Sequence, residues 1–211
     1  MTGDIKLTTP PGSKGVLLYD KAPGRSHVRT SRSVNDTILL SDIPVYTAFH
    51  DSGSVINKPK TIYFELRVLA MGSGEGDAGI AMGFLAPPYP SWRLPGWHRA
   101  SLGVHGDDGR RYVDDSYGGK DFVNAFAKND VVGIGMTFSP GYGGKGKVEV
   151  FFTRNGKREA AWDLHEERDK DVEEGDVTGL EGQHDLLAAV GVFGQVEFEA
   201  KFQRELWMFR P

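Results

Sequence analysis

The sequence predicts an all-β fold, an antiparallel β-sandwich with little helix. Apolar and polar residues alternate along residues 61–70 (TIYFELRVLA), which is the pattern of a strand with one buried face. Asn155-Gly156 lies between two strand-like segments and is the strongest short hairpin signal in the chain. Turn residues recur about every ten residues, and no segment shows a helical apolar period beyond a turn or two. Short strands at this spacing favour a sandwich.

The strand signals follow one another along most of the chain. The expected strands are residues 16–19, 37–40, 45–49, 61–70, 78–85, 101–105, 111–113, 131–138, 147–153, 160–164, 186–193 and 195–202. Residues 21–35 are basic and polar and are expected to form a loop. Residues 116–129 are expected to form a long loop with one helical turn, and residues 165–175 a charge-dense loop. Residues 206–209 are expected to complete the core.

Composition limits the domain organisation and the class of partner. Residues 1–15, rich in Thr, Pro and Gly, are expected to be a flexible arm, and residues 16–211 a single domain. A net charge of −4 with scattered Lys and Arg argues against nucleic acid as a partner. The absence of cysteine excludes a disulfide framework and suits the cytosol. No apolar run is long enough for a signal peptide or a membrane span, so we expect no membrane span in this chain.

Five motifs occur in the order in which SPRY domains carry them. They are YFELRV (63–68), RLPGW (93–97), SLGVHGDDG (101–109), NDVVGIG (129–135) and FFTRNGK (151–157). The ending VEFEAKF (196–202), followed by Trp207 and Phe209, is similar to the closing strand and tail of the family. The chain from about residue 45 to 209 thus resembles a SPRY domain. This resemblance implies a β-sandwich of the concanavalin-like jelly-roll type whose loops bind other proteins.

Two groups of SPRY proteins resemble this chain most. PPYPSWRLPGW (87–97) and FFTRNGK resemble fungal endosomal and vacuolar SPRY adaptors, which bring membrane-protein cargo to a HECT-type ubiquitin ligase. HGDDG resembles the Ran-binding-protein-M group, which scaffolds a multisubunit ubiquitin ligase. The chain lacks the adaptors' transmembrane helix and PPxY motifs, since Tyr89 in Pro87-Pro88-Tyr89-Pro90 stands one place early. It also lacks the helical dimerisation motifs of the scaffold group. Either membership implies a domain cut from a longer protein, and the adaptors imply a cytosolic face of endosomal or vacuolar membranes.

The resemblance also implies a site for a short segment of a partner protein. Val192, Phe193 and Gly194 match the Val-Trp-Gly loop with which SPRY domains of the SOCS-box group bind peptides, except that Phe stands for Trp. The alternative is a tight turn with Phe193 buried.

The other candidate binding residues lie around a Pro-Gly turn: Arg93, Leu94, Trp97 and His98. Aromatic residues in a rigid loop are good anchors for a partner, and Arg93 suits an acidic or carbonyl-rich peptide. The alternatives are that Trp97 covers the edge of the sandwich and that Arg93 ties down the loop. We expect this turn and the loop 192–194 to lie side by side at one edge, forming a shallow pocket.

The sequence favours binding over catalysis, with no cofactor and no metal. His98 and His105 with Asp107 and Asp108 do not have the spacing of a closed zinc site, and GDDG is ordinary turn chemistry. Residues 141–146 (GYGGKG) lack the spacing and the following helix of a phosphate-binding loop. The remaining alternative from another class is a carbohydrate-binding or hydrolytic jelly roll. A lectin would need polar residues beside an exposed Trp on a sheet face, whereas the aromatic residues of this chain lie in predicted loops.

Overall fold

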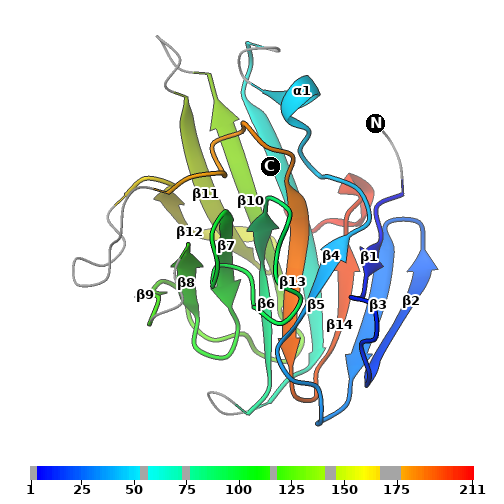
Figure 1. Ribbon diagram of the computed structural model, residues 1–211. Helices are drawn as coiled ribbons and strands as arrows, with labels where there is room; N and C mark the ends of the chain where they lie inside the picture. Colours follow the sequence, from blue (N-terminus) through cyan, green and yellow to red (C-terminus); the bar gives the residue numbers. More distant parts are fainter. Residues whose placement is uncertain (1–3, 53–56, 73–76, 115–117, 141–145, 167–176) are drawn as a thin grey trace.

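Two seven-stranded antiparallel sheets lie face to face in the computed structural model (Figure 1). The structure describes residues 4–52, 57–72, 77–114, 118–140, 146–166 and 177–211. Sheet A has the order β1 (Leu7–Thr8), β4 (Thr37–Ser41), β13 (Leu187–Phe193), β6 (Gly79–Leu85), β7 (Ser101–His105), β8 (Arg110–Val113) and β9 (Lys120–Asp121). Sheet B has the order β12 (Lys157–Asp163), β11 (Lys147–Arg154), β10 (Val131–Ser139), β5 (Lys60–Ala70), β14 (Glu197–Lys201), β3 (Arg25–Thr30) and β2 (Val16–Ala22). The predicted all-β sandwich is confirmed.

The hydrophobic core fills the space between the two sheets. Phe64 of β5 and Phe84 of β6 meet edge to face across it, with ring centroids 5.6 Å apart. Both side chains are fully buried, as are the inward-facing Ile134 of β10 and Val190 of β13. Alternate residues of a strand point inward, and the apolar alternation that this produces in β5 allowed that strand to be predicted from the sequence.

The prediction that β5 buries only one face is wrong. Tyr63 and Glu65 on its outer face are buried as well, at 5% and 1% exposure. The segment after the short 3-10 helix η2 (Arg204–Leu206) crosses this face, and the Trp207 ring lies 4.9 Å from the Tyr63 ring. The backbone N–H groups of Met208 and Phe209 donate hydrogen bonds to the Glu65 carboxylate at 2.8–2.9 Å. The chain thus covers the outer face of β5 with its own final residues.

The expected loop over residues 21–35 is also wrong, since it contains β3, which pairs with β2 and β14. Only Val28 of this strand places an apolar side chain fully inside. The buried hydroxyls have partners outside the strand: Ser26 Oγ donates to Asp20 Oδ1 of β2, and Thr30 Oγ1 donates to the Gly194 carbonyl after β13. A strand whose buried side chains are mostly polar shows no alternation of apolar and polar residues, so the sequence pattern does not predict it.

Two further expectations fail near the ends of strands. Residues 45–49 do not form a strand: Tyr46 makes a single bridge with Leu186, and α1 (Ala48–Asp51) follows. The Asp51 carboxylate accepts a hydrogen bond from the backbone N–H of Thr47, which stabilises this helical turn. The turn of helix expected in residues 116–129 is absent from the described part of that segment, which contains the short strand β9 instead.

The N-terminal arm lies against the sandwich at its described residues. β1 pairs with β4, Lys6 donates its backbone N–H to Asp42, and Asp4 accepts a hydrogen bond from Gln203. The arm is therefore extended along the sandwich, and its flexibility stays a prediction. The expected loop 165–175 and the phosphate-loop alternative at 141–146 lie mostly outside the described residues. Among the helices of the described residues, none is long and apolar enough to cross a membrane.

Candidate functional site

The segment 86–100, between β6 and β7, lies on the outer face of sheet A. Glycines in the strands beneath it make this close approach possible. A Cβ atom on Gly191 would lie 2.7 Å from Leu94 Cδ2 and from Pro95 Cδ. On Gly103 it would lie 2.5 Å from the Pro95 carbonyl oxygen. The segment therefore rests directly on the backbones of β13 and β7, as only glycine allows.

Hydrogen bonds to buried groups hold this segment in one shape. The Tyr89 hydroxyl donates to the Leu94 carbonyl at 2.6 Å, and the backbone N–H of Gly96 donates to Ser101 Oγ at 3.0 Å. His105 Nε2 lies 2.9 Å from the Pro95 carbonyl. Because that oxygen can only accept, Nε2 carries the proton. Burial lowers the pKa of His105, despite the Pro95 carbonyl and the charge of Asp108, so the imidazole is neutral near pH 7.

The residues predicted from the Pro-Gly turn are divided between the surface and the interior. Arg93 is half-buried, with its guanidinium carbon 5.0 Å from the centroid of the Trp92 ring. Trp97 is half-buried against His105, at 5.1 Å between ring centroids, and His98 is exposed. Leu94 is 1% exposed and packs on sheet A, so its side chain offers no contact area to a partner.

The residues of the loop 192–194 are likewise divided between the interior and the surface. Val192 is fully buried in the core, so its place in the predicted pocket wall is corrected: it supports the loop from inside. Phe193 is half-buried on the outer face of sheet A, where a Cβ on its strand partner Gly79 would lie 2.4 Å from the Phe193 ring. Gly194 has a φ of 60°, the left-handed conformation that glycine adopts without strain.

The two predicted segments are neighbours, but on a face instead of an edge. Leu94 and Pro95 lie over Gly191, which is two residues before Phe193 on the same side of β13. The expected neighbour of the turn was the loop 192–194, whereas the contact lies at Gly191, one residue before it. Its place differs because Gly103 of β7 and Gly191 of β13 let the segment 86–100 lie flat on sheet A.

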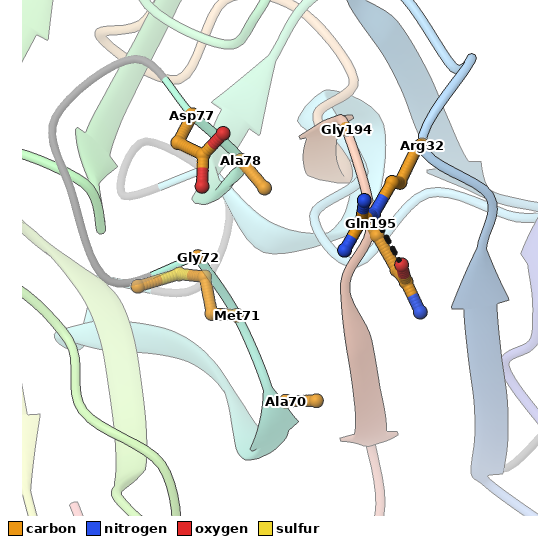
Figure 2. A pocket seen from close by; sticks show the side chains of 8 residues that line it. All are labelled: Arg32, Ala70, Met71, Gly72, Asp77, Ala78, Gly194 and Gln195. Atoms are coloured by element: carbon orange, nitrogen blue, oxygen red, sulfur yellow. Dashed lines mark hydrogen bonds between the residues drawn. The ribbon is translucent and has the colours of Figure 1, made fainter.

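A hollow opens beside this loop (Figure 2). The end of β5 and the residues just before β6, which line it, lie at the end of the sandwich away from α1 (Figure 1). We call this space the end hollow; its volume is about 530 Å³. Figure 2 shows Arg32 and Asp77 on opposite sides of it. Arg32 Nε donates to Gln195 Oε1 at 3.2 Å. The lining residues are Arg32, Ala70, Met71, Gly72, Asp77, Ala78, Gly194 and Gln195.

Gly194 shapes the wall of the end hollow. A Cβ there would lie 2.7 Å from Ala78 Cβ and from the Asp77 carbonyl oxygen, so only glycine lets the two turns meet. The Gly194 N–H donates to the Val34 carbonyl at 2.8 Å, and its own carbonyl accepts from Thr30 Oγ1 at 2.6 Å. These bonds fix the position of this part of the wall.

The sequence interpretation found Gly194 but missed Arg32 and Asp77, the two charged residues of the hollow. Arg32 lies in the stretch taken as a basic loop, and Asp77 ends a Gly-rich connection. Their positions relative to the strands could have identified them: Arg32 follows β3, Asp77 precedes β6 and Gly194 follows β13. A correct strand pairing would have placed these three strand ends together, and the missing β3 prevented it.

The described residues hold no cluster of three or more His, Asp and Glu side chains suited to a metal ion. His105 is buried and bonded to a backbone carbonyl, so it is not placed to exchange protons with a substrate. The geometry offers surfaces and charges for binding.

No protein-family model matches the chain. The chain is similar to a Ran-binding protein M homolog of Arabidopsis thaliana, 39% identical over 113 residues, or 51% of this chain and 22% of that protein. It is also similar to a SPRY domain-containing protein of Schizosaccharomyces pombe, 34% identical over 97 residues (46% and 22%). Protein ssh4 of Sclerotinia sclerotiorum is 32% identical over 130 residues (62% and 20%). The matches span about a fifth of the length of these relatives.

Solved structures resemble nearly the whole chain. A human SPRY domain superposes with a TM-score of 0.58 and 23% identity, covering 92% of this chain and 98% of that one. The SPRY domain of human HERC1 superposes with a TM-score of 0.51 and 12% identity, covering 92% and 96%.

Proposed function

We propose that this chain, which has the SPRY-domain fold and SPRY-domain relatives, is a protein-interaction module that binds a short segment of a partner. The binding site in this proposal is the end hollow together with the adjoining surface of Phe193. The observation that carries it is that the hollow is open while its wall is already fixed by hydrogen bonds from Gly194. Such a site binds a flexible segment without ordering the receptor, which lowers the entropic cost of binding.

Each part of the site has a separate contribution. Phe193 and Met71 offer apolar area, and the guanidinium of Arg32 offers donors for carboxylate or carbonyl oxygens. Arg93, on the neighbouring face, extends the surface along a longer segment, and Trp97 supports that face by packing on His105. Binding at such a site requires no catalytic group and no metal.

A carbohydrate site is the alternative from another class. Trp92 is 62% exposed, but the guanidinium of Arg93 lies against its ring and leaves less of the face for a sugar. Binding on a glycan array, without binding of any peptide, would favour that alternative.

The decisive test is a substitution whose side chain fills part of the hollow. Ala70 lines it at the end of β5, and Ala70→Phe should occupy part of its volume. Peptides selected from a random displayed library on the wild-type domain should bind this variant at least about tenfold more weakly. Ala161→Phe, on the exposed outer side of β12, is the matched control and should bind like wild type. Equal affinities of the two variants would exclude the hollow as the site.

We further propose that the longer protein serves ubiquitin ligation, as the substrate-recognition part of an adaptor in membrane-protein sorting. The similarity to Protein ssh4 and the resemblance to fungal SPRY adaptors support this. A HECT-type ligase would then be bound by regions outside this chain, on the cytosolic face of endosomal or vacuolar membranes. The similarity to Ran-binding protein M homologs supports the alternative of a scaffold subunit in a multisubunit ligase.

This wider role is tested with the full-length protein. Ala70→Phe should lower ubiquitin conjugation of the cargo membrane proteins while leaving the protein on endosomes or vacuoles. Unchanged ubiquitin conjugation of the cargo in the Ala70→Phe variant would contradict the adaptor role, as would a tagged protein that never reaches these membranes. Neither result would contradict the proposal that the domain binds a peptide segment.

A further inference from the structure

Opposite charges face each other across the end hollow without pairing. Figure 2 shows Asp77 on one side and Arg32 on the other. Within the described parts of the chain, neither side chain has an ion-pair partner. We infer that the hollow selects a partner segment that carries an acidic and a basic side chain, the acidic one toward Arg32 and the basic one toward Asp77. This inference rests on the proposed function.

Arg32 is held in position by one hydrogen bond and, among the residues that the structure describes, most of its other donors have no partner. Its Nε bonds to Gln195 Oε1, which fixes the plane of the guanidinium. The two terminal nitrogens keep N–H groups that fit the two oxygens of a carboxylate. By contrast, Arg25 and Arg154 on the same sheet already pair with carboxylates of the domain.

The opposite side of the hollow favours a cation. Asp77 lies two residues before Gly79 in the chain, and a Cβ on Gly79 would lie 3.4 Å from Asp107 Cβ and 2.4 Å from the Phe193 ring. A second aspartate and an aromatic ring therefore lie at the start of β6, next to the segment that carries Asp77. A lysine or arginine extended from the hollow would meet the Asp77 carboxylate and the Phe193 ring, which attracts cations at its face.

Small side chains keep the two charges apart and the space between them open. Among the described lining residues, Ala70, Gly72, Ala78 and Gly194 have small side chains or none. The hollow excludes part of the solvent, so a charge inside it is screened less than on a flat surface. Even so, each pair is expected to change affinity only about fivefold to tenfold, as for partly exposed ion pairs. The charges therefore select the order and direction of the segment more than they provide its affinity.

The test exchanges the two charges. Short random peptides displayed on phage are selected on the wild-type domain and on the double variant Arg32→Asp/Asp77→Arg. Wild type should select Asp or Glu and Lys or Arg at a constant offset, and the double variant should select the reversed order. A synthetic wild-type peptide should bind the double variant about tenfold or more weakly, and a peptide with exchanged charges should regain the affinity.

A second exchange controls for unspecific charge effects. Arg158 and Glu149 form an exposed ion pair on β12 and β11, with Nη2 and Oε2 2.8 Å apart. The double variant Arg158→Glu/Glu149→Arg should select the same peptides as wild type.

The outcomes separate the inference from the proposed function. Peptides that Ala70→Phe displaces, but that have no charge order or ignore the exchange, would overturn the inference and leave the function intact. Failure to select any peptide, or selection of peptides that bind Ala70→Phe as well as wild type, would overturn both.

Discussion

Phe193 and Trp97 have similar exposure but different surroundings. Phe193 lies over the bare backbone of Gly79 beside the end hollow. Trp97 packs on His105 and Tyr112, with ring centroids 5.1 and 6.0 Å apart. The first environment is that of an anchor for a partner and the second is that of a structural residue.

We therefore expect Phe193→Ala to weaken peptide binding by about 2 kcal/mol with little change in melting temperature. Trp97→Ala should instead lower the free energy of unfolding by about 2 kcal/mol, because it removes packing against two buried rings. Melting curves and peptide titrations of both variants check this. If Phe193→Ala lost stability in step with affinity, Phe193 would be a core residue and the anchor would lie elsewhere.

Glu65 is a buried carboxylate that holds the C-terminal segment. It accepts the N–H groups of Met208 and Phe209 and the hydroxyl of Tyr63. Glu65→Gln would leave some of these donors facing an amide N–H₂, so the free energy of unfolding should fall by about 2–3 kcal/mol. Urea unfolding measures this loss. Glu205→Gln, on the exposed side of η2, is the control, and equal stability of the two variants would contradict the role of Glu65.

The buried, neutral His105 leads us to expect that the folded domain loses stability in acid. Burial lowers its pKa, so the folded state binds fewer protons than the unfolded state below about pH 6.5, the ordinary histidine value. The contribution of His105 is complete above that pH and is lost as the pH falls toward the lowered pKa of the folded state. His105→Gln keeps a donor for the Pro95 carbonyl but does not titrate, so its unfolding free energy should fall less from pH 7 to pH 5. If the unfolding free energies of wild type and His105→Gln fell equally between pH 7 and pH 5, this would argue against a buried neutral imidazole.

At the scale of elements, the segment 86–100 depends on the glycines beneath it. A methyl group on Gly191 would lie 2.7 Å from Leu94 and Pro95, and the ring of proline cannot rotate away. Gly191→Ala should cost about 1–3 kcal/mol of stability and speed hydrogen exchange at Gly96 and Trp97. Gly118→Ala, whose Cβ meets nothing within 4 Å, should cost only the strain of its positive φ, about 1 kcal/mol, with no effect on that segment. Unchanged exchange in Gly191→Ala would show that the segment is not seated there.

Elements with apolar alternation were predictable and those with buried polar groups were not. β5 and the Asn155-Gly156 hairpin follow from local pattern, since both turn residues have the positive φ that such a hairpin requires. β3 was missed because Ser26 and Thr30 are buried with partners on other elements, which no local pattern reveals. The second buried face of β5 was missed because the residues that cover it come from the far end of the chain.

For the whole molecule, the site arises where strand ends from distant parts of the sequence meet. The resemblance identified Phe193 and Gly194 because they form a contiguous motif. Arg32 and Asp77 belong to no motif, and only the pairing of β3 with β14 and of β6 with β13 brings them to one end. Hydrogen bonds to Val34 and Thr30 hold the turn at Gly194, so we expect binding to leave the rest of the molecule unchanged.

The most direct test of this account is a titration of the ¹⁵N-labelled domain with a library-selected peptide, followed by amide chemical shifts. We predict changes concentrated at residues 31–33, 70–72, 77–79 and 193–195, with the core strands and the C-terminal segment on Glu65 unaffected. Changes concentrated on the outer face of sheet B, or spread through both sheets, would contradict a preformed peptide site at the end hollow.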